Sequence, residues 1–342
     1  MRIAVCAPQV PFARGGAEIL ADTLVDELRT RGHSAETVSV PYKWYPGTRA
    51  LSAALLWRLV DLTEADGELI DLVIPMKFPA YAVRHPRKVV WLIHQFRQAY
   101  EYDGTELGQF GDEPQDRAAV RAIHDLDRKM LGEARKVFAT TRNVAGRLAR
   151  STGIEAELLP HPPQQLAYRC DEYGDFVLSV GRLDPTKRVD LLLQAAAEQP
   201  SLRFVVAGDG PERERLEALA HGLGLDGRVT FAGRVGDEEL TDLYARCLAV
   251  FYAPADEDSG LVPYEAFLST KPVITTSDAG GPLEIVADQR TGLVCEPSST
   301  ALAEAFAWLA EHRDSAAELG RSGKEVAGRV TWDATIDRLL AA

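Results

Sequence analysis

The sequence has few cysteines, no long apolar run and no excess of basic residues. Its four cysteines among 342 residues form no CxxC pair and no metal-type spacing. We expect them to be buried, reduced side chains: Cys6, Cys170, Cys247 and Cys295. No apolar run reaches the roughly 18 residues of a membrane span. The opening residues, MRIAVCAPQV, meet a proline too early for a signal peptide. We therefore expect a cytoplasmic protein with at most peripheral contact to the inner membrane face.

The net charge of −13 is unevenly distributed along the chain. Residues 1–165 carry equal numbers of basic and acidic side chains, so the whole acidic excess lies in residues 166–342. This acidic second half argues against nucleic acid as a partner, because its binding requires a basic surface. The asymmetry, together with the chain length, favours two separate domains.

Short strands alternate with amphipathic helices through the first domain, which we place at residues 1–163. Strands are expected at 2–7, 36–40, 71–75, 88–93 and 136–140. Helices are expected up to about Arg31 and at 49–62, 115–133 and 142–151. This alternation is typical of a parallel sheet covered by helices on both faces.

A second α/β series follows a proline-rich linker at residues 159–163. Strands are expected at 176–181, 202–207, 228–232, 248–252, 272–275 and 292–295. Helices are expected at 188–199, 211–222, 237–245, 261–269 and, after the sheet is complete, 332–340. We therefore predict two doubly wound Rossmann-like domains, the second at 164–328, with a ligand between them at the carboxyl ends of the strands.

The stretch Asp256–Glu265, DEDSGLVPYE, separates a strand-like run from a helical one. Glu257 lies in the loop and Glu265 about two helical turns later, so the two carboxylates can hold two parts of one polyhydroxylated ligand. Gly260 is expected at the helix start, where free N–H groups favour an anion. A solvated acidic loop followed by an ordinary helix glutamate would give the same pattern.

Two features of the first domain also lie at predicted strand ends. The turn Gly15-Gly16-Ala17-Glu18 lets the backbone approach a ligand, although it is not a GxGxxG dinucleotide motif and could be a packing turn. His94 ends the strand VVWLI, which places it at the ligand edge unless it is a structural histidine. The long segment 95–114, rich in aromatic and acidic residues, is either a lid, a binding surface or an idle loop.

Arg182 and Lys187 lie five residues apart where the strand of SVGRLDPTKR turns into a helix. Two cations at the end of a parallel strand can converge on a diphosphate and stabilise charge on a leaving phosphate. Isolated surface charges would show the same spacing. Three more turns should border the same sheet edge: Gly208–Pro211, Phe231–Val235 and Ala279–Glu284.

In this order and spacing, these motifs resemble the retaining glycosyltransferases of family 4, which have the GT-B fold. The likeness extends over most of the chain, from GGAE through SVGRL, GDGP and FAGRV to GGPLEIVADQRTGLV. It implies that Arg182 and Lys187 hold the donor diphosphate and that the Gly16 backbone approaches the same phosphates. Glu265 would bind the nucleotide ribose, and Glu257 and His94 would contact the transferred sugar.

The resemblance assigns further residues to the donor. Backbone at Arg234 and Val235 would meet the base, and N–H groups of Gly260, Leu261 and Val262 would complete the sugar-phosphate site. Gly15, Asp209 and Ser259 are additional donor-binding candidates. Residues 1–163 would form the acceptor-side domain and 164–328 the nucleotide-sugar domain, with 329–342 crossing back to the first.

The activity implied is transfer of a hexose from GDP-mannose or a UDP-hexose to a hydroxyl, with retention, in surface polysaccharide or glycoconjugate synthesis. The acceptor would be a saccharide, a lipid-linked molecule or a small molecule. Neither cofactor nor metal is expected: Asp256-Glu257-Asp258 mimics a DxD metal motif, but the surrounding turns match the metal-independent family. The alternatives are a nucleotide-sugar 2-epimerase and a catalytically idle sugar-nucleotide-binding subunit. Ser259 and Thr270 replace the aromatic residue and the glycine that the family often has.

Overall fold

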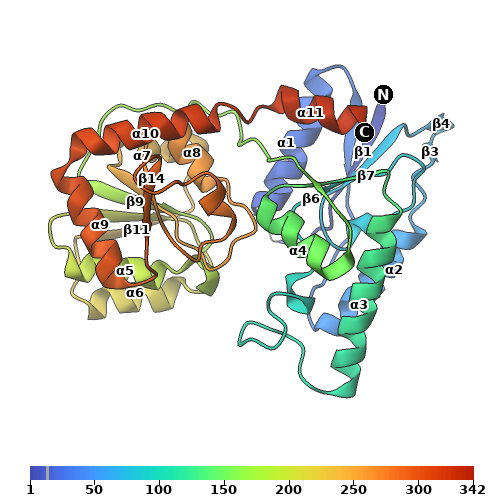
Figure 1. The fold of residues 1–342 in the computed structure, drawn as a ribbon, viewed down its shortest axis with the longest axis horizontal. Coiled ribbons are helices and arrows are strands. Elements are labelled where there is room, and N and C mark those ends of the chain that lie inside the picture. Colours follow the sequence, from blue (N-terminus) through green and yellow to red (C-terminus); the bar gives the residue numbers. More distant parts are fainter. Residues whose placement is uncertain (13–14) are drawn as a thin grey trace. The chain divides into compact units, whose positions relative to one another are not determined.

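A computed structural model describes residues 1–12 and 15–342 of the chain (Figure 1). Unit 1 comprises Met1–His161 and Trp332–Ala342, and unit 2 comprises Pro162–Thr331. The sequence pattern places the corresponding boundaries at 163 and 328. Arg14, with which the expected glycine turn begins, lies outside the described residues.

Unit 1 is built on parallel strands. Its strands are β1 (Arg2–Cys6), β2 (Ser34–Val38), β5 (Leu72–Pro75), β6 (Val89–Leu92), β7 (Lys136–Ala139) and β8 (Glu157–Leu158). They form two ladders, β2-β1-β5 and β6-β7-β8. Isolated parallel bridges from Val73 to Lys88 and from Lys77 to His94 connect β5 with β6. A small antiparallel hairpin, β3 (Glu64–Ala65) with β4 (Glu68–Leu69), is separate from these ladders.

Successive side chains of a strand point to opposite sides of the sheet, and here both sets are apolar. Helices therefore cover both faces of these strands. Ile3 and Val5 share a core with the helices α1 (Gly16–Thr30) and α11 (Trp332–Ala341). Ala4 and Cys6 share the opposite core with three helices: α2 (Ala50–Leu59), α3 (Pro114–Gly132) and α4 (Arg142–Thr152). The chain therefore returns to unit 1 at its last helix (Figure 1).

Unit 2 contains a six-stranded parallel sheet in the order β11-β10-β9-β12-β13-β14. The strands are β9 (Phe176–Val180), β10 (Arg203–Ala207), β11 (Val229–Gly233), β12 (Ala249–Phe251), β13 (Val273–Thr276) and β14 (Gly292–Cys295). The strand order reverses between β9 and β12. Ligands of doubly wound folds bind at such a switch point, outside the carboxyl ends of the strands.

Helices flank this sheet as well (Figure 1). One core contains residues of α5 (Val189–Glu198), α6 (Arg213–Gly222) and α9 (Ser299–Glu311). The opposite core contains residues of α7 (Asp237–Arg246) and α8 (Val262–Leu268). The long helix α10 (Arg313–Ala327) contributes residues to both cores. The sequence analysis identified neither α9 nor α10.

Two expectations need correction. Only Cys6 and Cys247 are buried. Cys170 is exposed, because it lies outside any helix or strand, and Cys295 is partly exposed at the end of the edge strand β14. The segment 95–114 is not simply a loop, since it contains the 3₁₀ turn η3 (Arg97–Ala99) and two buried aromatics. Phe96 stacks on Phe78 with ring centroids 5.1 Å apart, and Phe110 meets Phe96 edge-on. These rings contribute to packing.

Among the described residues, no helix combines the length and hydropathy needed to cross a membrane.

Candidate functional site

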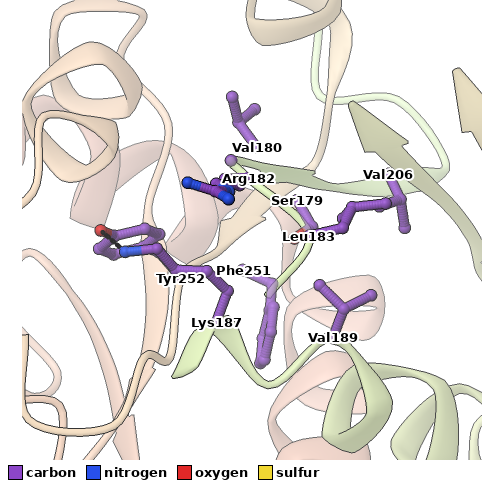
Figure 2. A pocket seen from close by; sticks show the side chains of 10 residues that line it. Ser179, Val180, Arg182, Leu183, Lys187, Val189, Val206, Phe251 and Tyr252 are labelled. Atoms are coloured by element: carbon purple, nitrogen blue, oxygen red, sulfur yellow. Dashed lines mark hydrogen bonds between the residues drawn. The ribbon is translucent and has the colours of Figure 1, made fainter. Parts of the chain in front are cut away.

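Lys187 and Glu257 form an ion pair across the switch point of unit 2. Lys187 ends the 3₁₀ turn η4 (Pro185–Lys187) after β9, and Glu257 follows β12. The Tyr252 hydroxyl donates to Glu257 Oε2 at 3.3 Å. It also lies 3.5 Å from Lys187 Nζ (Figure 2). Burial acts to lower the pKa of Lys187, but the negative charge of the paired Glu257 carboxylate outweighs this effect and leaves the pKa above its usual value. The ammonium group is therefore charged at neutral pH.

Arg182 supplies a second cation, and it lines the same pocket as Lys187 and Tyr252 (Figure 2). Its side chain is exposed, and among residues 1–12 and 15–342 no hydrogen bond or ion pair engages its guanidinium. The pocket here is lined by Ser179, Val180, Gly181, Arg182, Leu183, Lys187, Val189, Val206, Phe251 and Tyr252. An anion bound at this pocket would meet one unpaired and one paired cation.

The backbone holds the Glu257 loop from two sides. Ala255 N donates to Thr186 O at 2.8 Å, and Glu257 N donates to Ala279 O at 2.8 Å. Gly280 has a φ of 78°, and a Cβ there would lie 2.6 Å from Glu257 O. A Cβ at Gly281 would lie 2.4 Å from Asp258 O. Both glycines of GGPLE are therefore required by close backbone contact with the Glu257 loop.

Arg188 is a supporting residue that the sequence analysis missed. Its Nε donates to Ala253 O at 2.8 Å, and its guanidinium pairs with Asp278 at 2.7 Å and donates to Thr276 Oγ1 at 2.8 Å. The side chain thus joins the segments that follow β12 and end β13, next to the start of the Glu257 loop. Its position beside Lys187 gave no separate signal, because a basic pair is common on protein surfaces.

Glu265 lies on α8, close to the start of the helix. Tyr244 of α7 donates its hydroxyl hydrogen to Glu265 Oε2 at 2.7 Å. Burial raises the pKa of Glu265 above its usual value, although the Tyr244 hydrogen bond acts in the opposite direction.

Gly260 precedes this helix with a φ of 108°, and a Cβ there would lie 2.8 Å from the Tyr252 ring. The helix begins at Val262 with Leu261 as its N-cap, whereas the sequence predicted a start at 261. Ser259, just before Gly260, is buried.

The remaining predicted turns of unit 2 support one another. Leu183 N donates to Asp209 O at 3.1 Å, and Gly208 N donates to Gly233 O at 2.7 Å. A Cβ at Gly208 would lie 1.8 Å from Gly181 O, so only glycine fits there. Beyond β11, Arg234 is exposed and Val235 partly buried. The turns after β9, β10 and β11 thus lie together at one sheet edge.

The predicted residues of unit 1 form a separate group. Gly15 N donates to Glu18 Oε2 at 2.9 Å, so this N–H is already bonded within the turn. Gly16 begins α1, and Glu18 also pairs with Lys77 at 2.7 Å. His94 follows β6 and donates from Nδ1 to Gln95 O at 2.6 Å. Thus Gly15, Gly16 and His94 belong to unit 1, and the other predicted site residues to unit 2.

In the part of the chain that the structure describes, no group of three or more His, Cys, Asp or Glu residues is arranged to hold a metal ion.

Residues 167–326 match the family model described as "Glycosyl transferases group 1". This part of the chain is similar to the group 1 glycosyl transferases. The match contains every predicted site residue of unit 2, from Arg182 to Glu265, and none of unit 1.

Similar curated proteins are glycosyltransferases. A D-inositol 3-phosphate glycosyltransferase of Mycobacteroides abscessus is 30% identical over 254 residues, which cover 68% of this chain and 56% of the relative. A GDP-mannose-dependent alpha-(1-6)-phosphatidylinositol monomannoside mannosyltransferase of Mycobacterium tuberculosis is 35% identical over 179 residues, 48% of this chain and 46% of the relative. The chain spans about half the length of the curated relatives it matches.

Solved structures share the fold at low identity. Sucrose-phosphate synthase from Thermosynechococcus elongatus superposes with a TM-score of 0.81 at 20% identity, over 100% of this chain and 98% of that one. Anabaena HepE in complex with UDP-glucose superposes with a TM-score of 0.75 at 18% identity, over 100% and 98%. The predicted fold class is therefore confirmed: the chain has the GT-B fold, with two Rossmann-like domains.

Proposed function

We propose that the chain is a retaining glycosyltransferase of family 4, which transfers a hexose from a nucleoside-diphosphate sugar to an acceptor hydroxyl. The observation that carries this proposal is the Lys187–Glu257 pair, with Arg182 beside it, at the switch point of β9 and β12. The match of residues 167–326 to group 1 glycosyl transferases supports the same reading. A cationic pair and a carboxylate are the groups that a sugar diphosphate needs.

Donor binding exchanges the partners of the ion pair. The diphosphate replaces Glu257 as the counter-ion of Lys187, and the released carboxylate accepts hydrogen bonds from hydroxyls of the transferred sugar. Arg182 meets the same diphosphate without first losing a partner. Glu265, oriented by Tyr244, accepts from the ribose hydroxyls. Asp209, Arg234, Val235 and the backbone from Ser259 to Val262 border the nucleotide.

Transfer breaks the bond between the anomeric carbon and the diphosphate oxygen and forms a bond from that carbon to the acceptor oxygen on the same face. The departing phosphate oxygen accepts the acceptor's proton, so no side-chain base is required. Arg182 and Lys187 stabilise the charge that develops on the leaving phosphate. His94, from unit 1, contacts the transferred sugar, and the Gly15-Gly16 backbone approaches the phosphates. The proposal requires neither a metal ion nor a cofactor.

The donor is GDP-mannose or a UDP-hexose. One relative is named as GDP-mannose-dependent, and HepE was solved with UDP-glucose. The acceptor is a saccharide, a lipid-linked molecule or a small molecule, and the product belongs to surface polysaccharides or glycoconjugates. The enzyme works in the cytoplasm, with at most peripheral membrane contact.

Thermal-shift measurements with UDP, GDP and ADP and their sugars identify the donor, since a ligand that binds only the native state raises the melting temperature. Turnover of that donor is then compared among wild type, Lys187→Ala and Glu257→Gln. Both variants should lose about 100-fold or more in kcat. Lys324→Ala, which removes an exposed lysine of α10, is the matched control.

Full turnover in Lys187→Ala or Glu257→Gln would refute the residue assignment. Clean formation of an epimer from the donor alone would identify a 2-epimerase instead. Binding of donor without hydrolysis or transfer to any acceptor would identify an idle binding subunit.

A further inference from the structure

Asp127 is a fully buried carboxylate with neutral hydrogen-bond partners. It lies on α3 at 0% exposure. The Tyr81 hydroxyl donates to Oδ1 at 2.6 Å, and the Tyr100 hydroxyl and Gln95 Nε2 donate to Oδ2 at 2.8 and 3.2 Å. Within the described residues, no cation forms an ion pair with it. A buried charge without a counter-ion is costly, which suggests that the carboxylate does more than fill the core.

The three donors come from segments that follow β5 and β6. Tyr81 lies in the 3₁₀ turn η2 (Ala80–Ala82) after β5, whereas Gln95 and Tyr100 lie in the segment after β6. The carboxyl ends of parallel strands are the edge where α/β sheets bind ligands. Asp127 therefore joins two of the segments that form this edge in unit 1.

Gln95 connects this carboxylate to His94. Its side-chain amide has a partner at each end: Nε2 donates to Asp127 at 3.2 Å, and Oε1 lies 3.2 Å from Ser151 Oγ of α4. The single hydroxyl hydrogen of Ser151 is shared between this oxygen and the Arg147 carbonyl at 2.9 Å. Its main-chain carbonyl accepts from His94 Nδ1 at 2.6 Å. A residue whose side chain has a partner at each end thus presents the carbonyl that orients the imidazole.

We propose that Asp127 and Ser151 are positioning residues, which fix the orientation and the tautomer of His94 through Gln95. Because a carbonyl can only accept, the neutral imidazole carries its hydrogen on Nδ1 and its lone pair on Nε2, the form that accepts from a sugar hydroxyl. The catalytic consequence rests on the proposed function, in which His94 contacts the transferred sugar.

The protonation state of Asp127 makes the positioning of His94 dependent on pH. Burial raises the pKa of Asp127 to about 6, against the lowering effect of the hydrogen bonds from Tyr81, Tyr100 and Gln95. Below that pH, the carboxyl group becomes a donor at one oxygen and loses its charge, which makes it a weaker acceptor for Gln95 Nε2. The titratable groups facing Asp127 are Tyr42, Tyr81, Tyr100 and His124.

The test compares wild type with Gln95→Met, which keeps the length of the side chain but removes its amide, and with the milder Ser151→Ala. We expect about a tenfold lower kcat in Gln95→Met and a smaller loss in Ser151→Ala, with the KM for the donor changed less than twofold. ¹⁵N NMR of the His94 imidazole, assigned by its loss in His94→Gln, should show the Nδ1–H tautomer in wild type and a mixture in Gln95→Met. Thr23→Val, which removes a hydroxyl bonded within α1, is the control.

The wild-type kcat should also fall below about pH 6, and Asp127→Asn should flatten this decline. An unchanged tautomer together with an unchanged kcat in folded Gln95→Met would overturn the proposal. An unaltered low-pH decline in Asp127→Asn would contradict its pH consequence. If wild type turned over no nucleotide sugar, the proposed function would fail, while the tautomer measurement would still decide the positioning of His94.

Discussion

The two glutamates eight residues apart have different electrostatic environments. Glu257 faces the ammonium group of Lys187, whereas the side chain of Glu265 accepts from the neutral hydroxyl of Tyr244. Within the part of the chain that the structure describes, the first carboxylate therefore has a counter-ion and the second does not. Burial of Glu265 is consistent with a group whose hydrogen-bond partners arrive with a ligand.

Glu265→Gln should stabilise the protein at pH 8 and weaken donor binding about tenfold. The pKa of Glu265 is higher in the folded state than in the unfolded state. The free energy of unfolding of the wild type therefore falls as the pH rises from the unfolded-state pKa to the folded-state pKa, and the loss is complete above the latter. The stabilisation by glutamine is thus complete at pH 8 and disappears towards pH 4. Urea unfolding at both pH values measures it, with the exposed Glu304→Gln as control. Equal unfolding midpoints for Glu265→Gln and wild type at pH 8 would contradict this.

The charged residues of the site were predictable from the sequence, but their partners were not. Arg182, Lys187 and both glutamates lie in motifs that can be recognised along the chain. Tyr252 and Tyr244 act through hydroxyls that reach carboxylates only after β12, α7 and α8 have packed. Their roles depend on tertiary distances, which no local pattern contains. Whether the predicted residues bind the donor stays a prediction.

At the scale of the elements, the site depends on loops whose backbones touch. The Glu257 loop lies against the loop that precedes η5 (Gly281–Glu284), and Gly281 N donates to Glu257 O at 2.8 Å. Any side chain at Gly281 would displace the loop that carries the carboxylate.

Gly281→Ala should lower kcat by about 100-fold, because the shift separates Glu257 from Lys187. It should also cost about 1–3 kcal/mol of unfolding free energy through overpacking. Gly222→Ala is the control, since a Cβ at this α6 residue would meet nothing within 4 Å. Turnover and urea unfolding of both variants test this, and wild-type turnover in Gly281→Ala would exclude a role for the contact.

Helix α10 shows why an element can escape prediction from the sequence. Gly320 and Gly323 lower the helix propensity of α10. Tertiary contacts require glycine at both positions: a Cβ at Gly320 would lie 2.0 Å from Thr270 O, and one at Gly323 would lie 2.3 Å from the Phe267 ring. Thr270 itself has a φ of 58°, a conformation that favours glycine, in accord with the glycine that family 4 often has there.

At the scale of the whole molecule, the chain folds as two units with their own apolar cores. The final helix α11 belongs to unit 1, where Trp332 meets Trp91 edge-on at 6.1 Å. The alternation of strands and helices predicted both sheets, because hydrophobic periodicity is a local property. It could not predict the pairing of β5 with β6, which joins the ladders of unit 1.

Trp332→Ala should destabilise unit 1 by about 3–5 kcal/mol, because it empties a site that is 3% exposed. Denaturant unfolding should then separate into two transitions, with the earlier one belonging to unit 1. Trp308→Ala, at a residue that is 39% exposed, should cost less than about 1 kcal/mol. Equal losses in the two variants would show that α11 contributes little to the core.

The central claim is that unit 2 binds a nucleoside diphosphate at Lys187. Its most direct test is isothermal titration calorimetry of UDP, GDP and ADP with wild type, Lys187→Ala and Lys324→Ala. We predict that at least one nucleotide binds the wild type at one site per chain. Its affinity should fall tenfold or more, about 1.4 kcal/mol, in Lys187→Ala and stay unchanged in Lys324→Ala. Failure of all three nucleotides to bind, or equal affinity in wild type and Lys187→Ala, would contradict a diphosphate site at the switch point of unit 2.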